Sequence, residues 1–308
     1  RGSWGKLGND KVPSSEGSIT SEVVTTALGD VLFSGVNTGS DFTALKWEVT
    51  EETNVGVTAR LFDNSLSLEA DYYVRDTEDA VIPVERPLIP GATRQNVGEI
   101  RNSGFELSLN WSKNVSDEFS YSIGANLSTL KNEVLAVSSN TDFLTGGQFG
   151  VGQEPPSRME VGFPIGYFYG LQTNGVFQNQ AEVDGHATQA NASPGDLKYM
   201  DINGDGAIDS NDRTNLGDPI PDVTMGFNIG FNYKNFDFGA YTYASIGNDI
   251  VRNYERQQNQ TNKGIQFLNR WTGEGSTNAF HRVTNGANSN SLFSDFYVED
   301  GSYVRIQN

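Results

Sequence analysis

The chain has 308 residues, with 39 acidic and 21 basic side chains and a net charge of −18. This balance excludes nucleic acid as a partner, which needs a basic surface, and fits a solubilising or a cation-binding surface equally well. Cysteine is absent, which excludes disulfide scaffolds and Cys-ligated metal sites, and no apolar run is long enough for a membrane helix.

The first part of the chain predicts one hairpin. Residues 1–41 are rich in glycine and serine, with a single apolar patch at Val31-Leu32-Phe33. Alternating apolar residues then predict a strand over 55–61, a turn at Asp63-Asn64 and a return strand over 66–74. Such alternation gives a sheet one apolar and one polar face.

A second hairpin follows a proline-rich segment. Pro83, Pro87 and Pro90 predict a loop. Apolar residues then alternate with polar ones over 105–112 and again over 119–127, around a turn at Asn114–Glu118.

The rest of the chain alternates long polar loops with strands. Residues 164–177 are aromatic and predict a strand, 178–221 a long loop, 248–290 a second long loop, and 296–306 a last strand.

The clearest element is the hairpin over 223–246, with its turn at Lys234-Asn235. Its first strand places an apolar set on one face and small neutral residues on the other. The neutral face lacks the Lys and Glu of a solvent-facing sheet, so it suits a water-filled interior, with the apolar face toward lipid. The apolar set is Met225, Phe227, Ile229, Phe231 and Tyr233, and the neutral set is Thr224, Gly226, Asn228, Gly230 and Asn232.

Two regularities favour an all-β, antiparallel transmembrane β-barrel. Short turns alternate with long loops, as periplasmic turns alternate with extracellular loops in outer-membrane barrels. Aromatic residues also lie close to the short turns, as in an interfacial girdle. The alternative is a soluble sandwich or propeller, whose strands also alternate. The girdle candidates are Phe62, Trp111, Phe119, Tyr233 and Phe236.

Several motifs resemble those of TonB-dependent outer-membrane transporters. They are Leu45-Lys46-Trp47-Glu48, Leu61-Phe62-Asp63-Asn64, Asp71-Tyr72-Tyr73 and Asn96-Val97-Gly98-Glu99-Ile100-Arg101-Asn102-Ser103-Gly104-Phe105-Glu106. Others are similar to the SusC/RagA-like branch of Bacteroidetes, namely Val161-Gly162-Phe163-Pro164-Ile165-Gly166-Tyr167-Phe168-Tyr169-Gly170, Gly195-Asp196-Leu197-Lys198-Tyr199, Arg270-Trp271-Thr272 and Tyr297-Val298-Glu299-Asp300-Gly301-Ser302-Tyr303.

The resemblance implies a plugged barrel of about 22 strands in the outer membrane. Because the chain offers only about eight or nine strand signals, we expect residues 1–308 to form one partial barrel domain, without the plug, TonB box or closing strands. The resemblance further implies a non-enzymatic nutrient importer for oligosaccharides or peptides. Its partners would be a SusD-like surface lipoprotein, the TonB–ExbB–ExbD complex and the lipid bilayer. A secreted calcium-binding adhesin or carbohydrate-binding module is the alternative.

The sharpest chemical motif is a twelve-residue loop from Asp201 to Asp212. Oxygen-bearing side chains stand at positions 1, 3, 5, 9 and 12, and Gly206 stands at the sharp turn. Asp212 replaces the usual bidentate Glu, and no amphipathic helix flanks the loop, so this is not an EF-hand domain. We expect a weak structural Ca²⁺ site, the alternative being a turn without metal. The predicted ligands are Asp201, Asn203, Asp205, Ala207 through its carbonyl, Asp209 and Asp212.

The remaining candidates have simpler interpretations. His186 and His281 are expected to be surface histidines, and Arg270 and Trp271 to anchor a loop. Tyr241 and Tyr243 face the predicted lumen, where they could stack on sugars or pack the interior. We find no catalytic motif.

Overall fold

The computed structural model describes residues 1–9, 19–28, 31–40, 45–86, 89–137, 141–149, 154–253, 264–284 and 289–307. The chain divides into two compact units. The first comprises Arg1–Ser112, Ser128–Leu144 and Glu160–Phe163, and the second comprises Lys113–Leu127, Thr145–Met159 and Pro164–Asn308. Within the described ranges, no helix has the length and hydropathy needed to cross a membrane.

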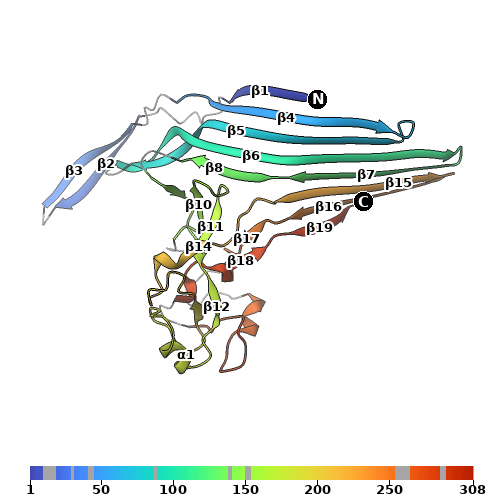
Figure 1. Cartoon of the computed structure of the whole chain (residues 1–308). Helices are drawn as coiled ribbons and strands as arrows, with labels where there is room; N and C mark the ends of the chain where they lie inside the picture. The colour runs from blue at the N-terminus through green and yellow to red at the C-terminus, as the bar shows by residue number, and fades with distance from the viewer. Residues whose placement is uncertain are drawn as a thin grey trace. The chain divides into compact units, whose positions relative to one another are not determined.

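The first unit is built on long antiparallel strands (Figure 1). Its strands pair in the order β1-β4-β5-β6, and β8 also pairs with β6. A separate hairpin, β2–β3, lies in the segment for which the sequence predicts no strand. The bounds are β1 (Gly2–Asn9), β2 (Ile19–Leu28), β3 (Val31–Ser40), β4 (Glu48–Leu61), β5 (Leu66–Arg86), β6 (Ile89–Ser116) and β8 (Lys131–Ala136).

The hairpin β4–β5 confirms the predicted turn. Leu61 pairs with Leu66 at the end of the ladder. Asp63 and Asn64 both adopt a positive φ, at 55° and 65°, which these residue types tolerate better than most.

The predicted proline loop is wrong for the described residues. β5 continues through Pro83, which pairs with Arg94 of β6. Among the described residues the pairing between β4 and β5 ends at Val49 and Glu78, so Pro83 lies beyond the reach of β4 and its missing N–H costs no bond to that strand. Pro87 lies outside the described residues.

The second unit holds the hairpin predicted most clearly. β15 (Val223–Tyr233) and β16 (Phe236–Ile246) pair in an unbroken register around the turn at Lys234 and Asn235. The order within this unit is β7-β15-β16-β19, with β7 at Phe119–Thr129 and β19 at Tyr303–Gln307. Since β6 ends at Ser116, the turn into β7 is shorter than the predicted range.

The two faces of this hairpin separate as predicted. On the apolar face the rings of Phe231 and Phe238 stack with their centroids 4.9 Å apart, and Phe119 contacts Tyr233 edge-on at 6.3 Å. Phe227 is 45% exposed in the described chain, although burying such a ring is worth about 1.5–3 kcal/mol. The apolar face therefore lacks a cover within the described chain.

The opposite face is closed by small residues and amides. Nδ2 of Asn232 donates to Oγ of Ser120 at 3.2 Å. A Cβ added to Gly124 would lie only 2.2 Å from Oδ1 of Asn228, so this amide occupies the space that the glycine leaves. Strands β7 and β15 thus form a neutral polar surface, since neither strand contains a charged side chain.

The long segments between these strands are compact rather than featureless. Two buried clusters form their core, namely Phe149, Phe168, Phe293 and Tyr297, and Leu171, Val176, Leu197 and Tyr199. The short strands are β9 (Phe143–Thr145), β10 (Ser157–Glu160), β11 (Tyr167–Leu171), β12 (Thr173–Val176), β13 (Leu197–Tyr199), β14 (Arg213–Asn215), β17 (Asp249–Val251) and β18 (Val298–Asp300). The helices are α1 (Gln180–Asp184) and the 3₁₀ turns η1 (Ser210–Asp212), η2 (Ile265–Asn269), η3 (Ser289–Ser291) and η4 (Asp295–Tyr297).

The predicted strand over 164–177 is confirmed as two strands, β11 and β12, and the predicted strand over 296–306 is divided between β18 and β19.

Candidate functional site

A fully buried carboxylate fixes the loops of the second unit. Asp196 is 0% exposed and accepts hydrogen bonds from Nε and Nη2 of Arg282, at 2.8 and 3.0 Å. Nδ2 of Asn290 donates to it at 2.8 Å, and the backbone N–H of Ser193 at 3.0 Å. A buried charge is tolerated when it is paired and hydrogen-bonded in this way. We call these four residues the Asp196 clasp.

The residue directly before Asp196 has to be glycine. Gly195 has a φ of +90°, and a Cβ there would lie 2.5 Å from Cε3 of Trp271. Its carbonyl accepts the backbone N–H of Arg282 at 2.7 Å. The sequence Gly195-Asp196 therefore ties two distant loops together through both backbone and side chain.

The Asp201–Asp212 loop turns around its own carboxylates. Oδ1 of Asp201 accepts the backbone N–H of Gly204 at 2.7 Å, and Oδ2 accepts that of Gly206 at 2.9 Å. Gly206 has a φ of +87°, which confirms the predicted sharp turn. Asp205 repeats the pattern with the N–H of Ala207 at 2.9 Å.

Asp212 supports the loop from inside. It is fully buried and accepts the backbone N–H groups of Ile202 and Asp209, both at 2.9 Å. The N–H of Asn203 lies at 3.4 Å. Burial alone would raise the pKa of Asp212, but these backbone donors together outweigh it and lower the pKa below its ordinary value. Its contribution to stability is therefore present above the ordinary pKa and is lost on acidification.

The four carboxylates among the predicted calcium ligands are close in sequence but are not gathered around one point. In the described chain, no group of three or more His, Asp or Glu side chains is arranged to hold a metal ion. Both oxygens of Asp212 face backbone N–H groups, so its assigned role as a ligand competes with its structural one. Calcium binding stays a prediction, with Asp201, Asn203, Asp205, the carbonyl of Ala207, Asp209 and Asp212 as its expected ligands.

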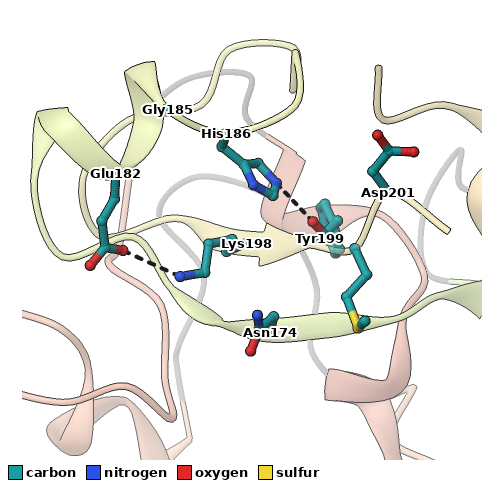
Figure 2. A pocket seen from close by; sticks show the side chains of 8 residues that line it. Asn174, Glu182, Gly185, His186, Lys198, Tyr199 and Asp201 are labelled. Atoms are coloured by element: carbon teal, nitrogen blue, oxygen red, sulfur yellow. Dashed lines mark hydrogen bonds and ion pairs between the residues drawn. The ribbon is translucent and has the colours of Figure 1, made fainter. Parts of the chain in front are cut away.

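Beside this loop lies a groove made of two adjoining hollows. Their volumes are about 380 and 480 Å³, and both are lined by Glu182 and Lys198. Nζ of Lys198 lies 3.3 Å from Oε2 of Glu182. Figure 2 marks this ion pair. His186 and Asp201 line the first hollow, and Glu274 lines the second.

Local chemistry positions the ion pair of this groove. Asn179 caps α1 by accepting the N–H of Glu182 at 3.0 Å, and Glu182 in turn accepts the N–H of Gln178 at 3.2 Å. The arrangement is close to a capping box, except that Glu182 accepts the N–H of the residue before the N-cap rather than that of Asn179 itself. The N–H of Gln178 is the largest cause that lowers the pKa of Glu182, and Lys198 adds to it. Sequence reasoning missed this groove, because its polar residues look like any loop.

The other predicted residues have structural roles. His281 is buried, with Nδ1 2.7 Å from the carbonyl of Arg282, so the expectation of a surface histidine is wrong there. Nε2 of half-buried His186 lies 2.8 Å from the carbonyl of Tyr199. Trp271 packs against the buried cluster of Leu171, Val176, Leu197 and Tyr199, which confirms its role as a loop anchor. Arg270, in contrast, is exposed. Tyr243 contacts the ring of Tyr303 at 5.9 Å, and Tyr241 pairs with Asn228.

Comparison with known proteins identifies the family. Residues 14–203 match the family model of the TonB dependent receptor-like β-barrel. The chain belongs to the TonB-dependent receptors. TonB-dependent receptor P3 of Formosa agariphila is 34% identical, with the alignment covering 100% of this chain and 31% of the relative. TonB-dependent receptor SusC of Bacteroides thetaiotaomicron is 25% identical over 94% of this chain and 28% of its own length.

Solved structures agree on the fold. The structure of the RagAB peptide transporter matches 99% of this chain and 33% of its own, with a TM-score of 0.74 and 22% identity. The resemblance to SusC/RagA-like receptors and the all-β, partial-barrel fold are thus confirmed. The relatives are receptors rather than enzymes, in line with the lack of a catalytic assignment. The chain spans about one third of the length of the receptors that it matches.

Proposed function

We propose that this chain is part of an outer-membrane importer that takes up oligosaccharides or peptides in a TonB-dependent manner. The observation that carries the proposal is the pair of faces on β15 and β16, in a chain that belongs to the TonB-dependent receptors. Exposed rings such as Phe227 and Phe238 are costly in water and stable against lipid. Asn228 and Gly230 on the other face suit a water-filled lumen.

The proposed partners follow from the family. SusC/RagA-like receptors pair with SusD-like lipoproteins, and the matched RagAB structures contain such a complex. A surface lipoprotein would help to capture the substrate, and the TonB–ExbB–ExbD complex would supply energy from the proton-motive force. The compact loops of the second unit, with their two apolar cores, offer a stable surface for such a partner.

The alternative of a secreted calcium-binding module explains these observations less well. A secreted module has to present charged or polar side chains on its outer strands. Here Phe231, Tyr233, Phe236 and Phe238 follow one face of a single hairpin, with 37–74% of each exposed. This density of exposed rings favours a membrane.

Uptake by intact cells tests the proposal. Cells that express the full-length receptor are supplied with fluorescent maltoheptaose or a fluorescent peptide pool, with and without a protonophore. We expect accumulation of at least one probe that depends on the receptor and stops when the proton-motive force is removed. Accumulation that persists with the protonophore would contradict energy-coupled import.

A further inference from the structure

We propose that the groove around Glu182 and Lys198 binds a short peptide through an amino group of that peptide. This inference rests on the proposed import function and names both a contact site and a substrate class. The two hollows fall within the size range of small-ligand sites, which is roughly 300–1,000 Å³. Because they share one ion pair, a single extended ligand can contact both.

The groove holds polar atoms that the fold does not use. Oε2 of Glu182 accepts from Lys198 and from the backbone of Gln178, which leaves Oε1 without a partner in the described chain. Oε1 of Glu274 accepts from Asn179 at 2.6 Å, and its Oε2 has no partner among the described residues. Both carboxylate residues line the second hollow. Lys198 donates to Glu182 and has further protons for a peptide carbonyl or carboxylate.

The charge of the lining selects the ligand. Glu182, Asp201 and Glu274 oppose the single lysine, Lys198, so these four side chains carry a net charge of −2. Such a groove attracts ammonium groups and repels acidic ligands. An amine between Glu182 and Glu274 would form charge-assisted hydrogen bonds, which are the stronger kind.

The lining offers little to a neutral sugar. Its only six-membered aromatic ring is that of Tyr199, which is 0% exposed, and Phe177 beneath Lys198 is also fully buried. No phenyl or phenol ring face is therefore open for stacking in this groove, and His186 offers only its half-buried imidazole. A peptide, in contrast, has a carbonyl or carboxylate for Lys198 and an amino group for the free oxygens of Glu182 and Glu274.

Binding to the purified full-length receptor tests the inference without energy coupling. The probes are the tripeptide Gly-Lys-Gly, the same tripeptide acetylated on both amino groups, and maltotriose. We expect Gly-Lys-Gly to bind about tenfold or more tightly than its acetylated form. Glu182→Gln and Glu274→Gln, which keep the size and one acceptor oxygen, should each weaken binding of Gly-Lys-Gly about tenfold.

A matched control comes from another ion pair. Glu118 lies 3.5 Å from Lys234 at a hairpin turn, so Glu118→Gln makes the same change outside the groove and should not alter binding. Equal affinity for both tripeptides, tighter binding of maltotriose, or unchanged binding in both groove variants would overturn the inference. Because this assay needs no proton-motive force, such a result would leave the importer proposal standing, whereas protonophore-resistant uptake would refute only that proposal.

Discussion

Replacing Asp196 by alanine should loosen the loops of the second unit. The substitution removes the acceptor of two hydrogen bonds from Arg282, one from Asn290 and one from Ser193. Breaking a buried ion pair typically costs 3–5 kcal/mol, about the range expected here. The Arg282 side chain is 32% exposed and can be partly solvated, so we expect about 3 kcal/mol.

Hydrogen exchange of the full-length receptor measures this cost. About 3 kcal/mol corresponds to roughly hundredfold faster exchange at amides that open locally. The effect should appear around residues 193–198 and 280–284, which the clasp joins, and not in the hairpin β15–β16. Asp184→Ala serves as the control, since Asp184 is exposed and, among the described residues, accepts a single hydrogen bond, from Nε2 of Gln180 at 2.8 Å. Exchange that is unchanged by Asp196→Ala, or equally changed by the control, would refute the role of the clasp.

Three further predictions concern the strands and their junction. Phe227→Arg should destabilise the folded barrel by about 2–4 kcal/mol and impair its assembly, while Asn228→Arg should leave heat-modifiable migration intact and alter transport. If the barrel tolerates both substitutions equally, a membrane barrel is contradicted. The turns at Asp63-Asn64, Asn114–Glu118 and Lys234-Asn235 are expected to face the periplasm. An impermeant maleimide added to intact cells should therefore label a cysteine placed at Ser210 but not one placed at Asn64. Burial, reinforced by the carboxylates of Asp300 and Asp222, raises the pKa of Asp249 above its ordinary 3.8. Its favourable contribution is therefore present below the ordinary value and lost as the pH rises through the raised one, so Asp249→Asn should slow exchange at residues 247–251 at pH 7 but not at about pH 3, while Asp237→Asn should not.

The strands that could be predicted are those whose signal is local. Alternation over 223–246 fixes both faces of the hairpin, and the two-residue turn fixes its register, so Phe231 meets Phe238 as expected. The turn at Asp63-Asn64 is local in the same sense. In contrast, Pro83 suggests a loop, and only the end of the pairing at Val49 makes it acceptable in a strand.

The site could be predicted only in part, because its contacts are distant in sequence. Gly206 and the turns of the calcium-type loop follow from spacing. Asp196 and Arg282 are 86 positions apart, and neither carries a local sign of the other. His281 sits in a polar stretch, so only the packing of Phe280 and Phe296 against its ring explains its burial. The groove likewise joins residues 174–201 to residues 274–278.

The last prediction separates two roles of the carboxylates in the Asp201–Asp212 loop. Asp212→Ala would leave the backbone N–H groups of Ile202, Asn203 and Asp209 without their acceptor. These hydrogen bonds are part-buried, and each contributes about 0.5–1.5 kcal/mol, so this variant should loosen the loop whether or not calcium is present. Asp205 is exposed, so water can replace it as the acceptor for the N–H of Ala207, and its loss should matter mainly if the loop binds Ca²⁺.

Limited proteolysis of the full-length receptor between Gly195 and Asp218 distinguishes these roles. With calcium at a few times its expected Kd of about 10⁻⁴–10⁻³ M, the wild-type loop should be protected relative to a sample with chelator. Asp205→Ala should remove that difference while leaving the chelated form close to wild type, and Asp212→Ala should be cleaved rapidly in both conditions. Barrel migration should be unchanged throughout, because the loop has its own short-range contacts. If chelator does not affect the wild type, and Asp205→Ala behaves like it in both conditions, the loop is a metal-free turn held by Asp212.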